Sequence, residues 1–379
     1  FHTASYFVIL PTMLKYIFVL IITIPLVVLS QKTDKYTSSY AQYFRAEELF
    51  QKAQYSAARY EYREFINSIR NENDPLIVKA YYYEGLSALE LYNNDAISLL
   101  ESFNKNYPDN IYKYTIGFRL GKYFFQKEDF ENSQIWFEKV PIKELEKKLH
   151  EEFLFKWGYS ALQNGNKQVA ISVFRDAKDG KSQYATPSLY FFSYLKYLSS
   201  SLQIALEGFE KLRLDSTFCG VVPHYIAQIY HKQERYQEVI DFAPTLANCT
   251  FIDNESDVNH LIGSAHYHLG NYASAITYLE NFNQNSKPTR DDAYELAFCY
   301  YKTKNYEKAI KQFDKVTSSD DSLAQVAMYQ IGESYLALGK LLPARSAFER
   351  ASEMNVLSDI QEDALYNFAV ISFKVDINP

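Results

Sequence analysis

A pattern of small and large residues returns about every 35 residues along this chain. The clearest copies have a small residue, a Tyr three positions later, an Ala twelve positions later and a Phe sixteen positions later. Two clear copies are Ala297, Tyr300, Ala309 and Phe313, and then Gly332, Tyr335, Ala344 and Phe348. A self-similar period of this length predicts a stack of helical hairpins. Such stacks usually hold other molecules rather than transform them.

The small residue that opens the pattern can be followed through nearly the whole chain. It stands at Ala46, Gly85, Gly121, Gly158, Ser193, Ala227, Gly263, Ala297, Gly332 and Ala369. A second, mostly small residue follows at Ala58, Ala96, Ser133, Ala170, Ala205, Val239, Ala275, Ala309 and Ala344. Two antiparallel helices approach closely only where small side chains lie at their crossing, so we expect the first small residue to face the second. An aromatic or Leu four residues later would fill the space between hairpins, and burying each contributes about 1.5–3 kcal/mol.

At these residues the sequence resembles the tetratricopeptide repeat family. The G/A-x-x-Y…A-x-x-x-F pattern matches the signature of that family in about nine units between residues 39 and 360. Two of these units, 186–219 and 220–255, are degenerate. The resemblance implies an all-α fold, a right-handed α-solenoid of about nine helix-turn-helix repeats plus a truncated tenth. It also implies an inner face, lined by the first helix of each repeat, that often binds peptides or protein segments.

The repeats are expected to occupy residues 31–361, and residues 362–379 are expected to form the first helix of a further, incomplete repeat. In that helix Leu365, Phe368 and Ile371 would form an apolar face without a partner helix. Repeat arrays normally end in a polar cap. The expectation is therefore that the natural protein continues past Pro379.

The N-terminal region carries a targeting pattern. Residues 1–12 precede Met13 and are interpreted as upstream translated sequence or as part of a fragment. Residues 13–30 have a short positive region, the uncharged segment Tyr16–Leu29 and small residues before a cleavage point after Ser30, which is typical of a secretory signal peptide. A retained membrane anchor is the alternative, although this segment is shorter than the roughly 20 residues that span a bilayer. We expect an exported protein of the periplasm or cell envelope, in contact with a membrane only through this segment.

Composition and motifs narrow the function. The net charge of −7 argues against nucleic-acid binding, which requires a basic stripe, and it permits basic or neutral protein partners. The sequence contains no nucleophile elbow, phosphate-binding loop, dinucleotide-binding loop, zinc-protease motif or Cys-x-x-Cys pair. We therefore expect a non-catalytic chain without a cofactor.

Three cysteines have different expected roles. Cys219 precedes the first helix of the sixth repeat and Cys249 follows its second helix, so the two ends should lie side by side in an antiparallel hairpin. In an oxidising compartment they would form a disulfide, and free thiols are the alternative. Cys299 lies inside a first helix and is interpreted as a small core residue.

Histidines cluster in two neighbouring repeats. In the repeat pattern of the family, His224, His231, His260 and His268 all point towards the inner face. A metal site, a pH-sensitive patch for a partner, and an ordinary polar surface are the three interpretations. We expect no metal. His266 takes a buried position and is interpreted as a packing residue.

The same pattern places a row of aromatic side chains on the inner face. They are Tyr82, Phe118, Phe125, Phe155, Tyr159, Tyr190, Tyr194, Tyr197, Tyr294, Tyr301 and Tyr329. Tyrosine provides a large contact area at low entropic cost, so these residues are candidates for contact with a partner. Packing between repeats is the alternative.

The sequence thus predicts a protein-binding scaffold of the cell envelope, similar to exported multi-repeat proteins of Gram-negative bacteria, with Bacteroidetes as the favoured lineage. Its partner would be a peptide or a folded protein held on the inner face of the repeats. Two other functions stay open. The array would be the docking arm of a larger enzyme or signalling protein whose active domain follows residue 379, or a factor in envelope or outer-membrane assembly.

Overall fold

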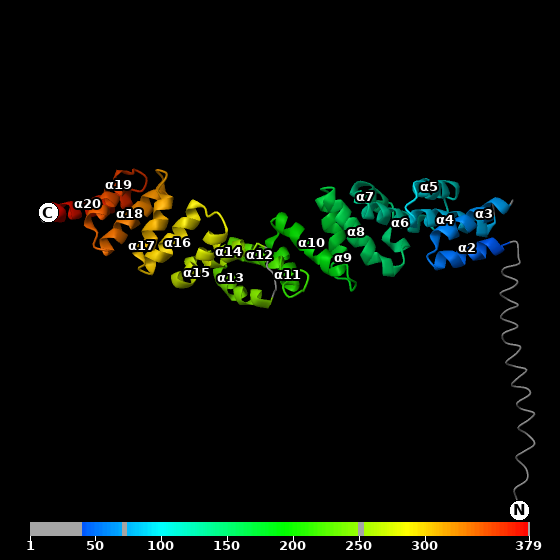
Figure 1. Cartoon of the computed structure of the whole chain (residues 1–379), viewed down its shortest axis with the longest axis horizontal. Coiled ribbons are helices and arrows are strands. Elements are labelled where there is room, and N and C mark those ends of the chain that lie inside the picture. Colours follow the sequence, from blue (N-terminus) through cyan, green and yellow to red (C-terminus); the bar gives the residue numbers. More distant parts are fainter. Residues whose placement is uncertain (1–39, 70–73, 249–253, 378–379) are drawn as a thin grey trace, which may run out of the picture. The chain divides into compact units, whose positions relative to one another are not determined.

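The computed structural model describes residues 40–69, 74–248 and 254–377 (Figure 1). The described residues form nineteen α-helices and four short 3₁₀ helices. No helix in these ranges is both long enough and apolar enough to cross a bilayer. The signal peptide or anchor predicted for residues 13–30 lies outside the described residues.

The helices alternate between the first and the second member of a hairpin. The first helices are α2 (Ala41–Gln51), α4 (Pro75–Glu90), α6 (Lys113–Gln126), α8 (His150–Gln163), α10 (Ala185–Leu198), α12 (Val222–Lys232), α14 (Glu255–His268), α16 (Arg290–Lys302), α18 (Ser322–Ala337) and α20 (Ser358–Ile377). The second helices are α3 (Tyr55–Ser68), α5 (Ala96–Asn106), α7 (Phe130–Glu138), α9 (Lys167–Ala177), α11 (Leu202–Leu212), α13 (Tyr236–Phe242), α15 (Tyr272–Asn285), α17 (Tyr306–Phe313) and α19 (Leu341–Glu353). The 3₁₀ helices are η1 (Ile142–Glu144), η2 (Lys147–Leu149), η3 (Ala243–Asn248) and η4 (Asp314–Val316).

The chain divides into two compact units, residues 1–184 with α2–α9 and residues 185–379 with α10–α20. Within each unit every helix packs against the helix before it and the helix after it. First helices also contact the next first helix, as α6 does α8 and α14 does α16. The all-helical fold of stacked hairpins predicted from the repeat is therefore confirmed.

The core of each hairpin is a small residue of the first helix against a large residue of the second. A β-carbon on Gly121 would lie 2.5 Å from Cε1 of Phe137, and one on Gly332 would lie 2.8 Å from Cε1 of Phe348. The same pairing joins Gly85 to Leu100, Gly158 to Phe174 and Gly263 to Leu279. The large residue thus fills the space that the missing β-carbon leaves inside its own hairpin. It also packs against the next hairpin, as the sequence predicted, since the ring centre of Phe137 lies 5.5 Å from that of Phe153 on α8.

The turn inside each hairpin takes a left-handed residue. Its φ is positive at Ala53, Tyr92, Glu128, Gly165, Ser200, Glu234, Gly270, Lys304 and Gly339. At Gly165 the amide donates to the carbonyl of Leu162 and the next amide, of Asn166, donates to Ala161. These two bonds form a Schellman cap, which satisfies the last carbonyls of the first helix and reverses the chain. Glycine adopts this conformation without strain, and most turns of this chain use another residue.

Helix α20 only partly matches the prediction of an unpaired apolar face. Ile371 is 2 % exposed and Phe368 is half-buried, because both pack against the cluster around Phe348 of α19. Leu365 is exposed as predicted, and Tyr366 and Phe373 are exposed beside it. The helical period explains the difference, since residues 364, 368 and 371 share the face that turns towards α19.

The nesting of Gly121 against Phe137 can be tested by substitution. Gly121→Ala should lower the free energy of unfolding by about 1–3 kcal/mol, because the added methyl group overlaps the ring. Phe137→Leu should partly restore Gly121→Ala, since Leu fills this place opposite Gly85 and Gly263. Urea unfolding of the two single variants and the double variant measures the coupling. Additive effects would show that the two residues do not share this space.

Candidate binding surface on the first helices

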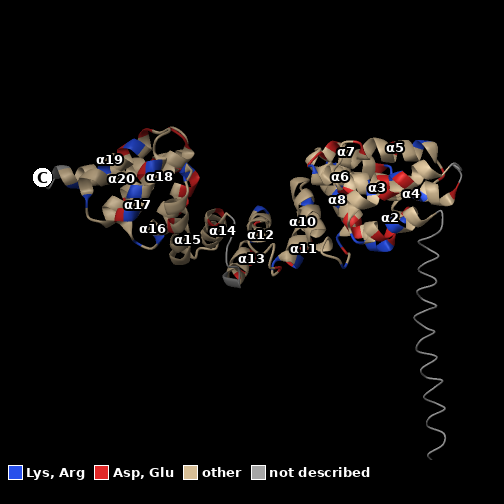
Figure 2. Ribbon diagram, turned by 45° about the vertical axis from the view of Figure 1, so that its right-hand side comes forward, with Lys and Arg blue, Asp and Glu red and all other residues tan. Residues whose placement is uncertain are grey.

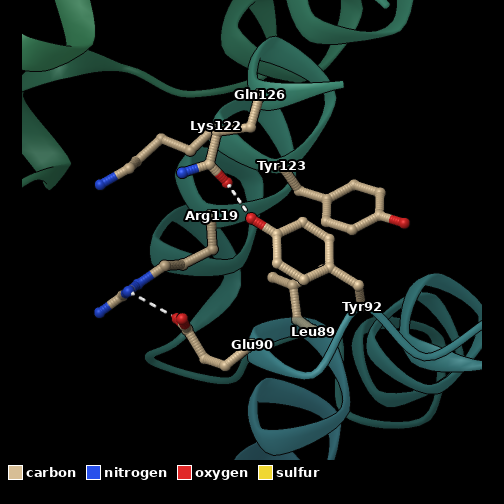
Figure 3. A pocket seen from close by; sticks show the side chains of 7 residues that line it. All are labelled: Leu89, Glu90, Tyr92, Arg119, Lys122, Tyr123 and Gln126. Carbon is tan, nitrogen blue, oxygen red and sulfur yellow. Dashed lines mark hydrogen bonds and ion pairs between the residues drawn. The ribbon is translucent and has the colours of Figure 1, made fainter.

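A small hollow of about 90 Å³ opens between α4 and α6 in the first unit (Figure 3). Its lining comes from the end of α4, the following turn and one face of α6. The residues are Leu89, Glu90, Tyr92, Arg119, Lys122, Tyr123 and Gln126. A hollow of this size accommodates a single side chain or a few water molecules.

The charged side chains that line this hollow form ion pairs. Nη1 of Arg119 lies 3.2 Å from Oε1 of Glu90, and Nζ of Lys122 lies 2.7 Å from Oε1 of Glu152 on α8. Lys156 of α8 lies 3.8 Å from the same Glu152 oxygen. Burial lowers the pKa of Lys156, Glu152 partly restores it, and Lys122 lowers it further. Figure 2 shows acidic and basic residues interspersed along the helices of both units. In the ion pairs described here, three cations share the two carboxylates of Glu90 and Glu152.

Tyr92 is the most unusual residue of the hollow. Its φ is 55°, in a turn position that Gly takes in three other hairpins, and its ring is 47 % exposed. The hydroxyl donates to Oε1 of Gln126 at 3.0 Å, and Lys127 Nζ lies 4.7 Å from the ring centre. Six of the nine hairpin turns have a left-handed residue other than Gly, so the backbone conformation of Tyr92 is the ordinary one of these turns. Tyr92 is distinguished by its large, partly exposed ring, which the hydrogen bond to Gln126 holds over the hollow.

The predicted aromatics of the first unit have two different environments. Tyr82 is 4 % exposed and stacks on Tyr112 with ring centres 3.9 Å apart, and Phe118 is 1 % exposed. These two residues are corrected to packing residues, because their rings are covered by the protein itself. Phe155 and Tyr159 are half-buried, with ring centres 6.1 Å apart. Their contact with a partner stays a prediction.

The predicted aromatics of the second unit are all partly accessible. Tyr190 and Tyr194 of α10 lie parallel with ring centres 6.3 Å apart. The hydroxyl of Tyr301 donates to Oε2 of Glu333 on the next first helix at 2.9 Å. The ring of Tyr329 packs against Phe348 at 5.4 Å. All four are half-buried, so each could still meet a partner, and their role stays a prediction.

Two of the four histidines predicted for the inner face lie together, since the ring centres of His231 and His268 are 6.1 Å apart and both rings contact Tyr236. His224 accepts from Nε2 of Gln228 at 2.9 Å when that ring nitrogen is unprotonated. His231 Nε2 lies 3.2 Å from Oγ of Ser264, and His260 Nε2 lies 2.7 Å from Oδ1 of Asp292. His268 is exposed and stacks on Tyr236 at 4.4 Å.

No group of three or more His, Cys, Asp or Glu side chains within residues 40–69, 74–248 and 254–377 is arranged to hold a metal ion. His266 is half-buried and stacks on Tyr278 at 5.6 Å, as expected for a packing residue. Cys299 is fully buried, which confirms its core position. Cys219 is half-buried and Cys249 lies outside the described residues, so the disulfide between them stays a prediction.

The ion pair of His260 and Asp292 joins α14 to α16. Burial lowers the pKa of His260, but the hydrogen bond and the charge of Asp292 outweigh it and raise that pKa above 6.5. Burial would raise the pKa of Asp292, yet the bonds from His260 and Thr289 lower it to about 2. Asp292 also completes the capping box of α16, since its carboxylate accepts from the amide of Thr289 at 2.7 Å.

The charged residues that the structure places on the first helices of both units were not among those predicted from the sequence. Lys122 and Gln126 follow Gly121 at spacings that belong to the inner-face pattern, so that pattern could have found them. Arg119 and Glu295 precede the small residue by two positions and lie outside the pattern. Only the structure shows that they contact the preceding first helix, Arg119 through Glu90 of α4 and Glu295 through Ser264 of α14.

Comparison with known proteins adds to this description. Residues 268–351 match the family described as anaphase-promoting complex, cyclosome, subunit 3. The TPR repeat-containing protein YpiA of Bacillus subtilis (strain 168) is 23% identical over 238 residues, which are 53% of this chain and 54% of that protein. The chain thus spans about half the length of this curated relative.

Several solved structures are similar at low identity. A tetratricopeptide repeat protein from Parabacteroides merdae ATCC 43184 is 15% identical, covering 68% of this chain and 99% of its own, with a TM-score of 0.39. The TPR2AB domain of yeast Sti1, solved in complex with pHSP90, is 12% identical, covering 68% and 97%, with a TM-score of 0.34. Because both scores are low, the description of the fold depends on the contacts within this chain.

The hairpins and their small-to-large register define a helical repeat protein. The chain is similar in sequence to a protein with tetratricopeptide repeats, in agreement with the resemblance of its own repeat signature to that family.

The ion pair of Asp292 provides a test of the electrostatics at α14 and α16. Asp292→Asn should lower the free energy of unfolding at pH 7 by about 1–2 kcal/mol, because it removes the charged partner of His260. A lowered acid pKa stabilises the folded chain above the unfolded value of 3.8, and this stabilisation is lost as the pH falls towards 2. The difference between the two proteins in urea unfolding should therefore shrink between pH 5 and pH 3. The exposed Asp314→Asn is the control, and an equal effect of both variants would contradict this account.

Proposed function

We propose that this chain is a non-catalytic scaffold that binds a protein segment on its first-helix face, with the hollow between α4 and α6 as an anchor point. The exposed ring of Tyr92, in the lining that also contains Arg119 and Lys122, carries this proposal. It offers a partner a large aromatic contact next to two cationic side chains.

The chemistry of the rim favours an acidic partner segment. Arg119 and Lys122 line the hollow and Lys127 lies against the ring of Tyr92, while Glu90 and Glu152 offset only part of their charge. Such a local excess of cations attracts acidic segments although the whole chain has a net charge of −7.

Photo-crosslinking from inside the hollow would identify the partner in the living cell. A benzophenone amino acid at Gln126 lies in the lining, and the same group at Ile135 lies on the exposed face of the second helix α7. The proposal expects a defined crosslinked protein from position 126 and not from position 135. Equal products from both positions, or none from position 126, would contradict it.

The partner found in this way allows the anchor to be tested. Tyr92→Gly should weaken its affinity about tenfold or more, since it removes a central aromatic contact. The free energy of unfolding should change by less than about 1 kcal/mol, because Gly adopts the left-handed turn conformation without strain while the hydrogen bond to Gln126 is lost. Ser200→Gly makes the same change in the turn after α10 without removing a ring, and it should leave binding unchanged. Unaltered affinity of Tyr92→Gly in titration calorimetry would reject Tyr92 as the anchor.

We also propose that the protein works in the cell envelope after export. The support is the uncharged segment Tyr16–Leu29 that follows Lys15. Residues 1–40 fused to alkaline phosphatase in a bacterial host should give activity, because that reporter needs an oxidising compartment. Leu20→Arg within the apolar segment should abolish it. An inactive fusion, or one that tolerates Leu20→Arg, would count against export.

A further inference from the structure

In the second unit, polar side chains of three successive first helices form a hydrogen-bonded line. Oγ of Ser264 on α14 donates to Oε1 of Glu295 on α16 at 3.1 Å. Ser264 also lies 3.2 Å from Nε2 of His231 on α12. Because its one hydroxyl proton goes to Glu295, Ser264 must accept from His231. The line therefore runs His231 to Ser264 to Glu295.

Glu295 ends this line in an unusual environment. Its second oxygen, Oε2, is buried and has no hydrogen-bond partner within the described chain. A buried carboxylate oxygen without a donor is costly when the group is ionised and much less so when it is protonated. Burial raises the pKa of Glu295 to about 7, while the nearby His260 and the bond from Ser264 lower it less strongly, and Asp292 and Asp291 raise it further.

The pKa values of other groups near Glu295 are also shifted. His231 is held neutral near pH 7, because burial first and then His268 and His260 lower its pKa. Tyr236 of α13, Tyr267 of α14 and Cys299 of α16 each have a raised pKa, to which the charge of Glu295 contributes.

Charged groups on the remaining neighbours of α16 are engaged elsewhere. Glu280 of α15 bonds to Tyr300 and to Lys308 of α17. Glu333 of α18 accepts from Tyr301. Arg290, at the start of α16, pairs with Asp321 and donates to the carbonyl of Val316 in η4.

We propose that Glu295 makes the packing of α14 against α16 sensitive to pH near neutrality, so that the two helices are held together when Glu295 is protonated and loosen when it ionises. The reason is geometric. Ionisation places negative charge on Oε2 of Glu295, which is buried and accepts no hydrogen bond from the described residues, since Ser264 donates to the other oxygen. The inference concerns the interface between two repeats and does not depend on the proposed partner.

The direction of the effect follows from linkage. The carboxyl group binds its proton more tightly in the folded chain than at its ordinary pKa of 4.5. Its contribution to the stability of the α14–α16 interface is therefore most favourable below pH 4.5, declines as the pH rises to about 7, and is constant above that. The full decline corresponds to a change in the opening equilibrium on the order of a hundredfold.

Hydrogen exchange of the wild-type full chain and of Glu295→Gln, measured at the same pH, isolates the contribution of the Glu295 carboxyl group to this opening equilibrium. The intrinsic exchange rates cancel in the ratio, and the amides of α14 and α16 report the opening of their interface. At pH 5 the two proteins should exchange alike in residues 255–302. At pH 8 the wild-type chain should exchange there about tenfold or more faster than Glu295→Gln. Segments of the first unit should be unaffected at both pH values.

Two further variants make the result decisive. Glu307→Gln, an exposed change in the second helix of the same hairpin, should match the wild type at every pH. Ser264→Ala removes the donor that stabilises the ionised carboxylate, so the loosening should continue to a higher pH than in the wild type before it levels off. A ratio between wild type and Glu295→Gln that stays the same from pH 5 to pH 8 would overturn the proposal, and so would an equal response in the first unit.

Discussion

The stack depends on close contact between a small residue of each first helix and a large residue of its partner. Where the small residue is Gly, the ring or the Leu side chain occupies the place of the absent β-carbon, as at Gly158 and Phe174. The two helices can then lie close enough to exclude water from the hairpin. Each hairpin presents its remaining apolar face to the next, so the core continues through each unit.

This contact also determines which residues can serve a partner. The second helices bury their small and large residues completely, as Ala309 and Phe313 illustrate. Polar and half-buried aromatic side chains are left on the first helices, where they reach the next first helix about 30 residues away, as from Lys122 to Glu152. The candidate surfaces of both units are such contacts between neighbouring first helices.

The fold was predictable because the repeat encodes local geometry, while the site depended on contacts between repeats. Positions such as Ala297 and Gly332 located the hairpins, each of which the structure forms from two antiparallel helices. The family pattern places the candidate surface on the first helices, and it also assigned Tyr82 and Phe118 to that surface although both are buried. Glu295 escaped notice because its properties come from burial and from Ser264 one repeat earlier. A single carboxylate in a helix carries no sign of either in the sequence.

The nesting of Gly against aromatic rings can be observed directly by NMR of the protein labelled at its 12 glycines. The α-protons of Gly121, Gly158 and Gly332 should be shifted upfield by the rings of Phe137, Phe174 and Phe348, with nuclear Overhauser effects to the ring protons. Gly165, Gly270 and Gly339, in the open turns, should show neither effect. Helical glycines with unshifted α-protons and no contact to a ring would contradict the account of how this chain folds.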